Sequence, residues 1–431
     1  MQYFSTNRTS TPVSFREAVL NGQPEDKGLY FPETITSFSP DRLAAFRTLS
    51  KEELAFEVIR PYVAGDISEN DLHDICKATV SFDFPLVKVT DNISALELFH
   101  GPTLAFKDVG AKFMSQCLGH FADKASKKTV VIVATSGDTG GAVANGFYKA
   151  DGVEVVILYP RGRVSRVQEL QLTTLGENVI TLEVQGTFDD CQAIAKSALA
   201  DESLKKNAFL TSANSINVAR WLPQQFYYWI ALNDWDGQPP VFAVPSGNYG
   251  NVTAGMMANV AGLPIQGFVL ASNANDAVPR YFETGKMEPK PTIRTISNAM
   301  DVGNPSNFVR MLEIFDRKGV AYRDKVSAVS ITDDETKETL MRIYNESNYI
   351  MDPHGAVAYL ALERFLSENK NLNGIFLETA HPVKFDIVKD ILGTYGNIPD
   401  SVTELENKTK HSIEIGADYN AVKELLLEKV L

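Results

Sequence analysis

The sequence predicts an α/β protein built on largely parallel sheets. Short runs rich in β-branched residues recur along the chain and are apolar almost throughout, as expected for strands covered on both faces. Segments long enough for helices lie between these runs, and such alternation is typical of parallel sheets. The predicted strands span 129–134, 154–160, 178–184, 241–245, 266–271 and 374–379. The predicted helices span 105–120, 140–150, 188–200, 215–232, 252–262 and 355–368.

Both ends of the chain depart from this alternation. Before residue 90 the pattern favours helices at 41–60 and 69–78, which indicates a separate, mainly helical N-terminal region over 1–90. After residue 392 a polar stretch precedes an amphipathic helix at 418–430, which indicates a peripheral helical tail over 393–431. The α/β core then spans 91–392. A length of 431 residues suits two or three packed units of ~150 residues each.

Composition and charge narrow the possible functions. Lys and Arg number 41 against 54 Asp and Glu, so a net charge of -13 disfavours nucleic acid and anionic lipid as partners. No apolar run approaches the ~20 residues of a membrane helix. The three cysteines have no CxxC spacing, and His354 and His381 have no metal-binding spacing, so we expect neither disulfides nor a metal. A cytoplasmic protein with a local site for any anionic ligand fits these features.

Two turns that follow predicted strands have the composition of anion sites. Glycines let backbone N–H groups approach an anion, and a following helix adds unpaired donors and a positive dipole end. The first turn contains Gly247, Asn248, Tyr249, Gly250 and Asn251. The second contains Thr135, Ser136, Gly137, Asp138 and Thr139 and is suited to a carboxylate. An ordinary strand-to-helix turn is the alternative for the first, and N-capping is the alternative for the second.

Further candidates are single side chains near helix starts and strand ends. Lys107 lies among apolar and small residues, where burial would favour a neutral amine that acts as nucleophile and base. The alternative is a surface lysine on an amphipathic helix. Asn214, Ser215 and Arg220 begin a long aromatic helix, and the arginine fork suits phosphate, although a surface ion pair would also explain it. Thr379 ends the last predicted strand, where side chains reach a site.

Taken together, these segments resemble the threonine synthase family, a branch of the fold type II pyridoxal-phosphate enzymes that also include the tryptophan synthase β chain. The resemblance runs in order along almost the whole chain, through GQPEDKGLYFP, HGPTLAFKD, ATSGDTG, LYPRGRVS, SANSINVAR, VPSGNYGN, SNAMDVGNPSN, DPHGAVAY and TAHPVKF. It implies two open, largely parallel-sheet subdomains with the active site between them. It also makes the N-terminal region a candidate lid.

The resemblance implies pyridoxal 5'-phosphate as the cofactor and assigns a role to each candidate residue. Lys107 would hold the cofactor covalently and act as the catalytic base, Thr379 would hydrogen-bond the pyridine nitrogen, and Asp138 would approach the ring hydroxyl. The cofactor phosphate would lie in the turn formed by Gly247, Asn248, Tyr249, Gly250 and Asn251. The substrate carboxylate would lie in the loop formed by Thr135, Ser136, Gly137, Asp138 and Thr139. The substrate phosphate would lie at Asn214, Ser215 and Arg220.

The implied reaction converts O-phospho-L-homoserine and water to L-threonine and phosphate by γ-elimination and β-addition of water. Another fold type II lyase, such as threonine dehydratase or a phosphohomoserine phospholyase, is an alternative within the same fold. A non-catalytic ligand-binding relative is an alternative of a different class. The expected partner is the small-molecule substrate, and the oligomeric state, monomer or homodimer, stays open.

Overall fold

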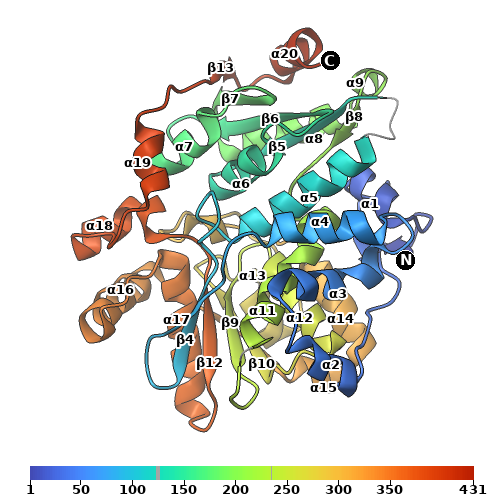
Figure 1. Ribbon diagram of the computed structural model, residues 1–431. Coiled ribbons are helices and arrows are strands. Elements are labelled where there is room, and N and C mark those ends of the chain that lie inside the picture. The colour runs from blue at the N-terminus through green and yellow to red at the C-terminus, as the bar shows by residue number, and fades with distance from the viewer. Residues whose placement is uncertain (123–126, 234) are drawn as a thin grey trace.

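The computed structural model describes residues 1–122, 127–233 and 235–431, and two sheets organise it into a larger and a smaller subdomain (Figure 1). The larger subdomain contains a six-stranded sheet in the order β11-β10-β9-β12-β4-β3. All its neighbouring strands are parallel except β3 and β4. Its strands are β3 (Leu86–Lys88), β4 (Ile93–Glu97), β9 (Val241–Pro245), β10 (Gly267–Ser272), β11 (Val326–Ser330) and β12 (Gly374–Glu378).

The smaller subdomain contains a five-stranded, all-parallel sheet in the order β13-β7-β6-β5-β8. Its strands are β5 (Thr129–Ala134), β6 (Val153–Pro160), β7 (Val179–Gln185), β8 (Phe209–Thr211) and β13 (Ile413–Gly416). Every residue of β5 is buried, which explains why its sequence is continuously apolar. The two sheets confirm the predicted α/β class with two largely parallel-sheet subdomains.

Helices cover both sheets and join them. In the smaller subdomain, α6 (Asp138–Phe147) and α8 (Phe188–Ala200) pack on the strands, while α17 (Pro353–Glu368) packs on β9, β10 and β12 of the larger one. Helix α5 (Lys107–Ala122) packs against α6 and therefore lies where the subdomains meet (Figure 1). The other helices of the core are α7 (Arg166–Thr173), α9 (Glu202–Lys205), α10 (Val218–Trp221), η1 (Leu222–Gln225), α11 (Phe226–Asn233), α12 (Gly250–Ala261), α13 (Ala277–Thr284), η2 (Asn298–Met300), α14 (Phe308–Lys318), α15 (Val320–Arg323), α16 (Asp333–Ser347), η3 (Pro382–Lys384) and α18 (Asp386–Leu392).

Two predicted helices are interrupted in the structure. The helix expected at 41–60 is two helices, because Ser50 caps the start of the second one and forms a capping box with Glu53. The helix expected at 215–232 divides into α10, η1 and α11, with Pro223 at the start of the 3-10 turn. Local capping and proline geometry therefore set these boundaries, while the apolar periodicity runs across them.

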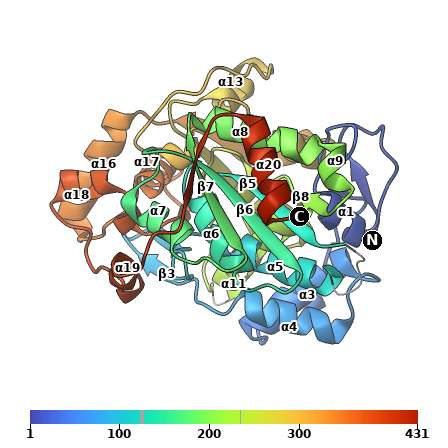
Figure 2. The same ribbon diagram turned by 90° about the horizontal axis from the view of Figure 1, so that it is seen from above.

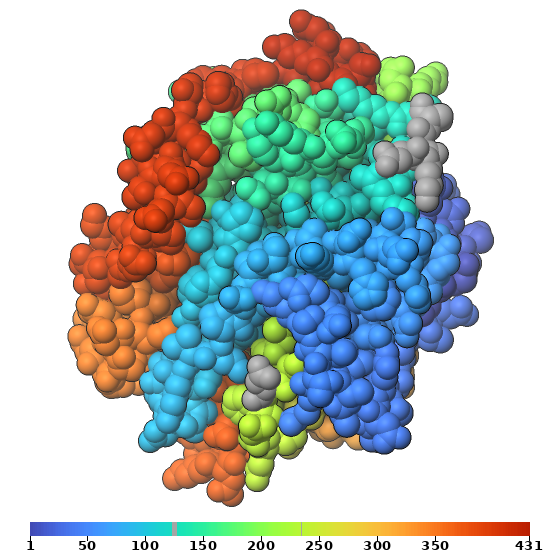
Figure 3. All heavy atoms as spheres, in the orientation of Figure 1, coloured from blue at the N-terminus to red at the C-terminus, as the bar shows by residue number. Residues whose placement is uncertain are grey.

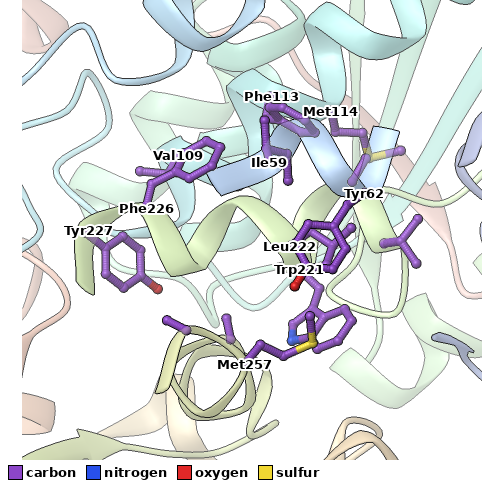
Figure 4. Close-up of a cluster of buried hydrophobic side chains, with 14 of the residues drawn as sticks. Ile59, Tyr62, Val109, Phe113, Met114, Trp221, Leu222, Phe226, Tyr227 and Met257 are labelled. Atoms are coloured by element: carbon purple, nitrogen blue, oxygen red, sulfur yellow. The ribbon is translucent and has the colours of Figure 1, made fainter. Parts of the chain in front are cut away.

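The N-terminal region is mainly helical, as predicted, and shares the core of the larger subdomain. It contains β1 (Tyr3–Ser5), α1 (Phe15–Asn21), β2 (Tyr30–Pro32), α2 (Pro40–Phe46), α3 (Lys51–Val63) and α4 (Glu69–Thr79). Figure 4 shows Ile59 and Tyr62 of α3 in one apolar cluster with Phe113 of α5 and with Trp221 and Leu222. This packing fixes α3 against the helix that begins at the candidate lysine. A lid function for the region stays a prediction.

The C-terminal tail runs along one edge of the molecule, from beside the larger subdomain to the top of the smaller one (Figure 3, red). It contains α19 (Asp400–Glu406), β13 and α20 (Tyr419–Lys429). Helix α20 confirms the predicted terminal helix and packs against α8 (Figure 2). Strand β13, which the prediction of a helical tail omitted, is short and only partly buried, and it forms the edge of the smaller sheet next to β7.

Candidate active site

The candidate residues gather where the strands of the larger sheet end. Strands β9 and β12 are parallel neighbours, so the segments that follow Pro245 and Glu378 leave the same edge of the sheet. The chain after Glu378 pairs with the segment before Lys107, because the backbone N–H of Phe106 donates to the carbonyl of Thr379 at 2.9 Å. A cavity of about 400 Å³ opens nearby and is lined by residues of both subdomains, including Ser165 and Lys384.

Lys107 begins α5, and its side chain is only 18% exposed. Burial lowers the pKa of its ammonium, and the positive charges of Lys384 and Arg220 lower it further, whereas Asp138 opposes the shift. Its Nζ lies 3.8 Å from Oδ2 of Asp138. This environment differs from that of a solvated surface lysine, and it suits an amine that must lose its proton.

Asp138 is a buried carboxylate at the start of α6. Its Oδ1 accepts from Nζ of Lys384 at 2.7 Å and from Nε2 of Gln168 at 2.9 Å, so only Oδ2 faces Lys107. Burial alone would raise the pKa of Asp138, but the two lysine charges and these hydrogen bonds hold it below its usual range. The preceding Gly137 has φ 145, and a Cβ atom there would lie 2.5 Å from the side chain of Gln168. The motif containing Lys384 was recognised in the sequence, but the lysine itself was not predicted as a site residue.

The hydroxyls of the loop before α6 have different environments. Thr135 is buried, and its Oγ1 accepts from the backbone N–H groups of Gly137 at 3.0 Å and Gly140 at 2.9 Å. This hydroxyl therefore stabilises the turn itself. Ser136 is exposed and Thr139 half-buried, and no other described residue accepts from or donates to their hydroxyls. These two hydroxyls remain available to a ligand.

The turn before α12 has the geometry of an anion site. Tyr249 has a left-handed backbone with φ 60, and no side chain caps the helix that starts at Gly250. Oδ1 of Asn251 accepts from the hydroxyls of Tyr227 and Tyr228 at 2.8 Å each, which fixes its amide orientation. Nδ2 of Asn251 is then a buried donor with no partner among the described residues. Uncapped backbone donors and a buried amide at one helix start favour a bound anion.

The residues around 215 reach the same turn. Oγ of Ser215 accepts from Nδ2 of Asn248 at 2.6 Å and from Nδ2 of Asn307 at 3.2 Å. Asn248 in turn accepts from the backbone N–H of Ser306 at 2.6 Å. Asn214 is half-buried beside them in the chain. The contacts of Ser306 and Asn307 were not predicted, although both belong to the recognised 297–308 motif.

Arg220 is 2% exposed, so it is not the surface arginine considered as an alternative. Its Nε and Nη1 are buried and have no hydrogen-bond partner among the described residues. Burial lowers the pKa of its guanidinium to about 10, and the negative charge of Asp108 opposes this shift. A buried guanidinium with free donors is costly unless an anion joins it. The structure therefore supplies a buried guanidinium that can bind an anion, in addition to the uncapped helix start at Gly250.

A buried network that the sequence analysis missed lies behind Thr379. His354 accepts at Nε2 from the backbone N–H of Ala299 at 3.1 Å, so its Nδ1 carries the proton and donates to Asp352 at 2.5 Å. Asp352 also accepts from the backbone N–H of Ala380 at 3.3 Å. Burial and the Asp352 charge raise the pKa of Glu378 well above its usual value, which favours the neutral acid. Thr379 itself is 7% exposed, and its hydroxyl has no partner among the residues described.

Neither histidine singled out in the sequence takes part in a metal-binding cluster. His381 accepts at Nδ1 from the backbone N–H of Val383 at 3.1 Å, which caps η3. Within residues 1–122, 127–233 and 235–431, no group of three or more His, Cys, Asp or Glu side chains is arranged to hold a metal ion. In the same described parts of the chain, no helix has the length and apolar character needed to cross a membrane.

Comparison with known families extends these observations over the whole chain. The model of the pyridoxal-phosphate dependent enzymes matches residues 88–374. Models of the threonine synthase N terminus and of the threonine synthase C-terminal region match residues 2–80 and 355–426. The chain is 40% identical to threonine synthase of Escherichia coli over 99% of both proteins. It is 36% identical to threonine synthase of Saccharomyces cerevisiae over 100% of this chain and 98% of the relative.

Solved structures give the same result. The crystal structure of Escherichia coli threonine synthase superposes with a TM-score of 0.92 at 39% identity, with 99% of both chains covered. A threonine synthase from Brucella melitensis with bound pyridoxal phosphate superposes with a TM-score of 0.92 at 33% identity, with 99% and 98% covered. These matches confirm the fold type II architecture, the enzyme class and pyridoxal 5'-phosphate as the cofactor. The chain belongs to the threonine synthase family of pyridoxal-phosphate-dependent enzymes.

Proposed function

We propose that this enzyme converts O-phospho-L-homoserine and water to L-threonine and phosphate. The observation that carries the proposal is the buried, unpartnered guanidinium of Arg220 near Lys107, apart from the uncapped helix start at Gly250. A reaction of a phosphorylated amino acid on a phosphorylated cofactor requires two phosphate positions around one amine. The family membership independently favours the same substrate.

The residues at the site fit the cofactor. In this proposal the helix start at Gly247 to Asn251 holds its phosphate, because the backbone donors there are uncapped and Nδ2 of Asn251 has no partner. Lys107 would bind its aldehyde group, and Thr379 would offer a hydroxyl to its ring nitrogen. The neutral hydroxyl at this position contrasts with the acidic residue that many pyridoxal enzymes place there. When bound, the cofactor supplies an electron sink for negative charge at the substrate carbon next to the amine.

The protein side chains supply binding and proton transfer. Lys107, whose pKa is lowered, accepts the proton from the substrate Cα once its amine is released, and it is positioned to move the proton lost from Cβ. Arg220, together with Asn214 and Ser215, binds the substrate phosphate and stabilises the charge that grows on it as the Cγ–O bond breaks. Ser215 also accepts from Asn248 of the turn proposed for the cofactor phosphate, so it lies beside both phosphates in this proposal. Ser136 and Thr139 bind the substrate carboxylate. A proton then returns to Cγ, water adds its hydroxyl at Cβ, and a proton returns to Cα, which together give threonine.

The alternative lyase reactions predict different products and different use of Arg220. A dehydratase acting on threonine or serine has no phosphate to place against this guanidinium. A phospholyase would release phosphate but yield 2-oxobutanoate in place of threonine.

The free thiols of Cys76, Cys117 and Cys191 are all buried, which supports the expected reducing, cytoplasmic location.

The decisive experiment incubates the holoenzyme with O-phospho-L-homoserine and measures phosphate, threonine and 2-oxobutanoate together. We expect phosphate and threonine in equal amounts, with little keto acid. Equal amounts of phosphate and 2-oxobutanoate would refute the proposal and show that the enzyme is a phospholyase. A purified protein with no visible absorbance of a lysine-bound cofactor, and no turnover, would favour the non-catalytic relative.

A further inference from the structure

Lys384 is a fully buried lysine that the reaction described above does not use. It ends the 3-10 turn η3 in the larger subdomain, and its side chain is 0% exposed. Its ammonium donates to the carbonyl of Thr103 at 2.7 Å and to Oδ1 of Asp138 at 2.7 Å. A buried ammonium is costly unless it is paired and hydrogen-bonded, so this position calls for a specific partner charge.

The contact orients the Asp138 carboxylate. Lys384 and Gln168 both bind Oδ1, at 2.7 and 2.9 Å, and this leaves Oδ2 directed toward Nζ of Lys107 at 3.8 Å. The three partners come from η3, α7 and α5, while Asp138 begins α6. The carboxylate is thus held at the contact between the two subdomains, and its free oxygen points at the reactive amine.

The contact also balances charge around Lys107. Asp138 has two cationic neighbours, and Lys384 is the closer one, so Lys107 is not needed as the counter-ion of this carboxylate. Without Lys384, the remaining attraction of Asp138 would hold the proton on Lys107 more tightly. The other charged groups that act on these two residues are Asp108, Arg220 and Asp352.

We propose that Lys384 is a positioning residue for the reaction proposed above: it keeps Asp138 ionised, with Oδ2 turned to Lys107, and so keeps Lys107 ready to release its proton. The inference rests on the proposed function for its consequence in turnover. The arrangement of Lys384, Asp138 and Lys107 itself can be tested without substrate.

The test compares Lys384→Met, Asp138→Asn and the double variant as holoenzymes. The first readout is the pH midpoint of the visible absorbance change of the lysine-bound cofactor. Loss of the Lys384 charge raises this midpoint by about one pH unit or more, and loss of the Asp138 charge lowers it by a similar amount. The double variant returns close to the parent, because both charges are removed together.

The second readout is turnover of O-phospho-L-homoserine. We expect Lys384→Met to lower kcat on the order of 10²-fold, with a smaller change in KM. The effects of Lys384→Met and Asp138→Asn are not additive, so the double variant loses less than the product of the single losses. The matched control is Lys410→Met, since Lys410 bridges Glu169 and Glu183 at 2.7 and 2.9 Å and is not one of the charges named as acting on Lys107. It should leave both readouts unchanged.

The competing explanation is that Lys384 only holds the turn at Thr103. In that case Lys384→Met lowers the melting temperature but leaves the absorbance midpoint unmoved, and its losses add to those of Asp138→Asn. Either result overturns the proposal. If Lys384→Met does not fold, Asp138→Asn still tests the proposal. An absorbance midpoint that does not fall in Asp138→Asn would refute the proposed effect of the Asp138 charge on Lys107. The absorbance readout needs no substrate. It therefore still tests the role of Lys384 if the enzyme does not convert O-phospho-L-homoserine.

Discussion

Replacing Glu378 with glutamine tests whether this buried acid is neutral in the folded enzyme. Its side chain is 0% exposed and lies against the charged Asp352, which together raise its pKa well above the usual value. Glutamine has the same shape and no charge, and it keeps an oxygen for the backbone N–H of Asp352, now 3.3 Å from Oε2. Its amide group also replaces the carboxyl proton as a donor toward Asp352. We therefore expect Glu378→Gln to fold and to keep kcat within about threefold.

The size of the stability effect follows from proton linkage. The unfolded chain releases this proton near pH 4.3, whereas the folded protein keeps it to a much higher pH. Between these values the unfolded state binds fewer protons than the folded state, so the parent loses stability as pH rises, by about 1.4 kcal/mol per pH unit. Glutamine removes this loss. The stability of Glu378→Gln relative to the parent should therefore grow as the pH rises from 5.5 to 7.5, by at most about 1.4 kcal/mol per pH unit.

The assay is urea unfolding of parent and variant at both pH values, with differences taken at the same pH so that other titrating groups cancel. Glu428→Gln, on an exposed position of α20, is the control and should show a difference that does not depend on pH. A Glu378→Gln variant whose relative stability stays constant or falls with pH would refute the neutral acid. It would mean that Glu378 is ionised beside Asp352 in the folded state.

Three further substitutions test other parts of the site. Lys107→Ala should abolish both the visible absorbance of the bound cofactor and turnover, and retained activity would remove its assigned role. Arg220→Ala should lower kcat/KM for O-phospho-L-homoserine on the order of 10²-fold while pyridoxal-phosphate affinity changes less than threefold, so equal losses in both titrations would place Arg220 outside the substrate pocket. Gly355→Ala adds a Cβ atom 2.0 Å from Oε1 of Glu378 and should lower stability by about 1 to 3 kcal/mol in thermal unfolding, whereas an unchanged melting temperature would contradict this tight contact.

The structural features that depend on the local sequence pattern were predicted well. Strand β5 has the expected bounds, because six consecutive buried residues leave a continuous apolar run. Strands β4, β8 and β11 were not predicted, since they are short and partly polar. The turn at 247–251 and Lys107 were candidates because of their glycine-rich and apolar surroundings, but their roles were predicted from the family resemblance.

Contacts between distant segments were not predictable in the same way. Lys384 and the carbonyl of Thr103 are 281 residues apart, and no periodicity connects them. The pairing of Glu378 with Asp352 likewise requires the strand end and the start of α17 to meet in space. The family motifs that contain Lys384 and Asp352 identified these segments as belonging to the site. The motifs alone did not predict which charged side chains pair with each other.

These long-range contacts make the chemistry of Lys107 depend on how the subdomains pack. Helices α5 and α6 pack closely, and their first residues, Lys107 and Asp138, lie 3.8 Å apart. Lys384 of η3 binds both Asp138, at 2.7 Å, and the carbonyl of Thr103, in the segment that leads into Lys107. A shift of Asp138 that lengthened this bond by about 1 Å would take it beyond hydrogen-bonding range and leave Lys107, at 3.8 Å, about as close to the carboxylate as Lys384. If Lys384 acts as proposed, the packed arrangement is therefore the one in which Lys107 can give up its proton.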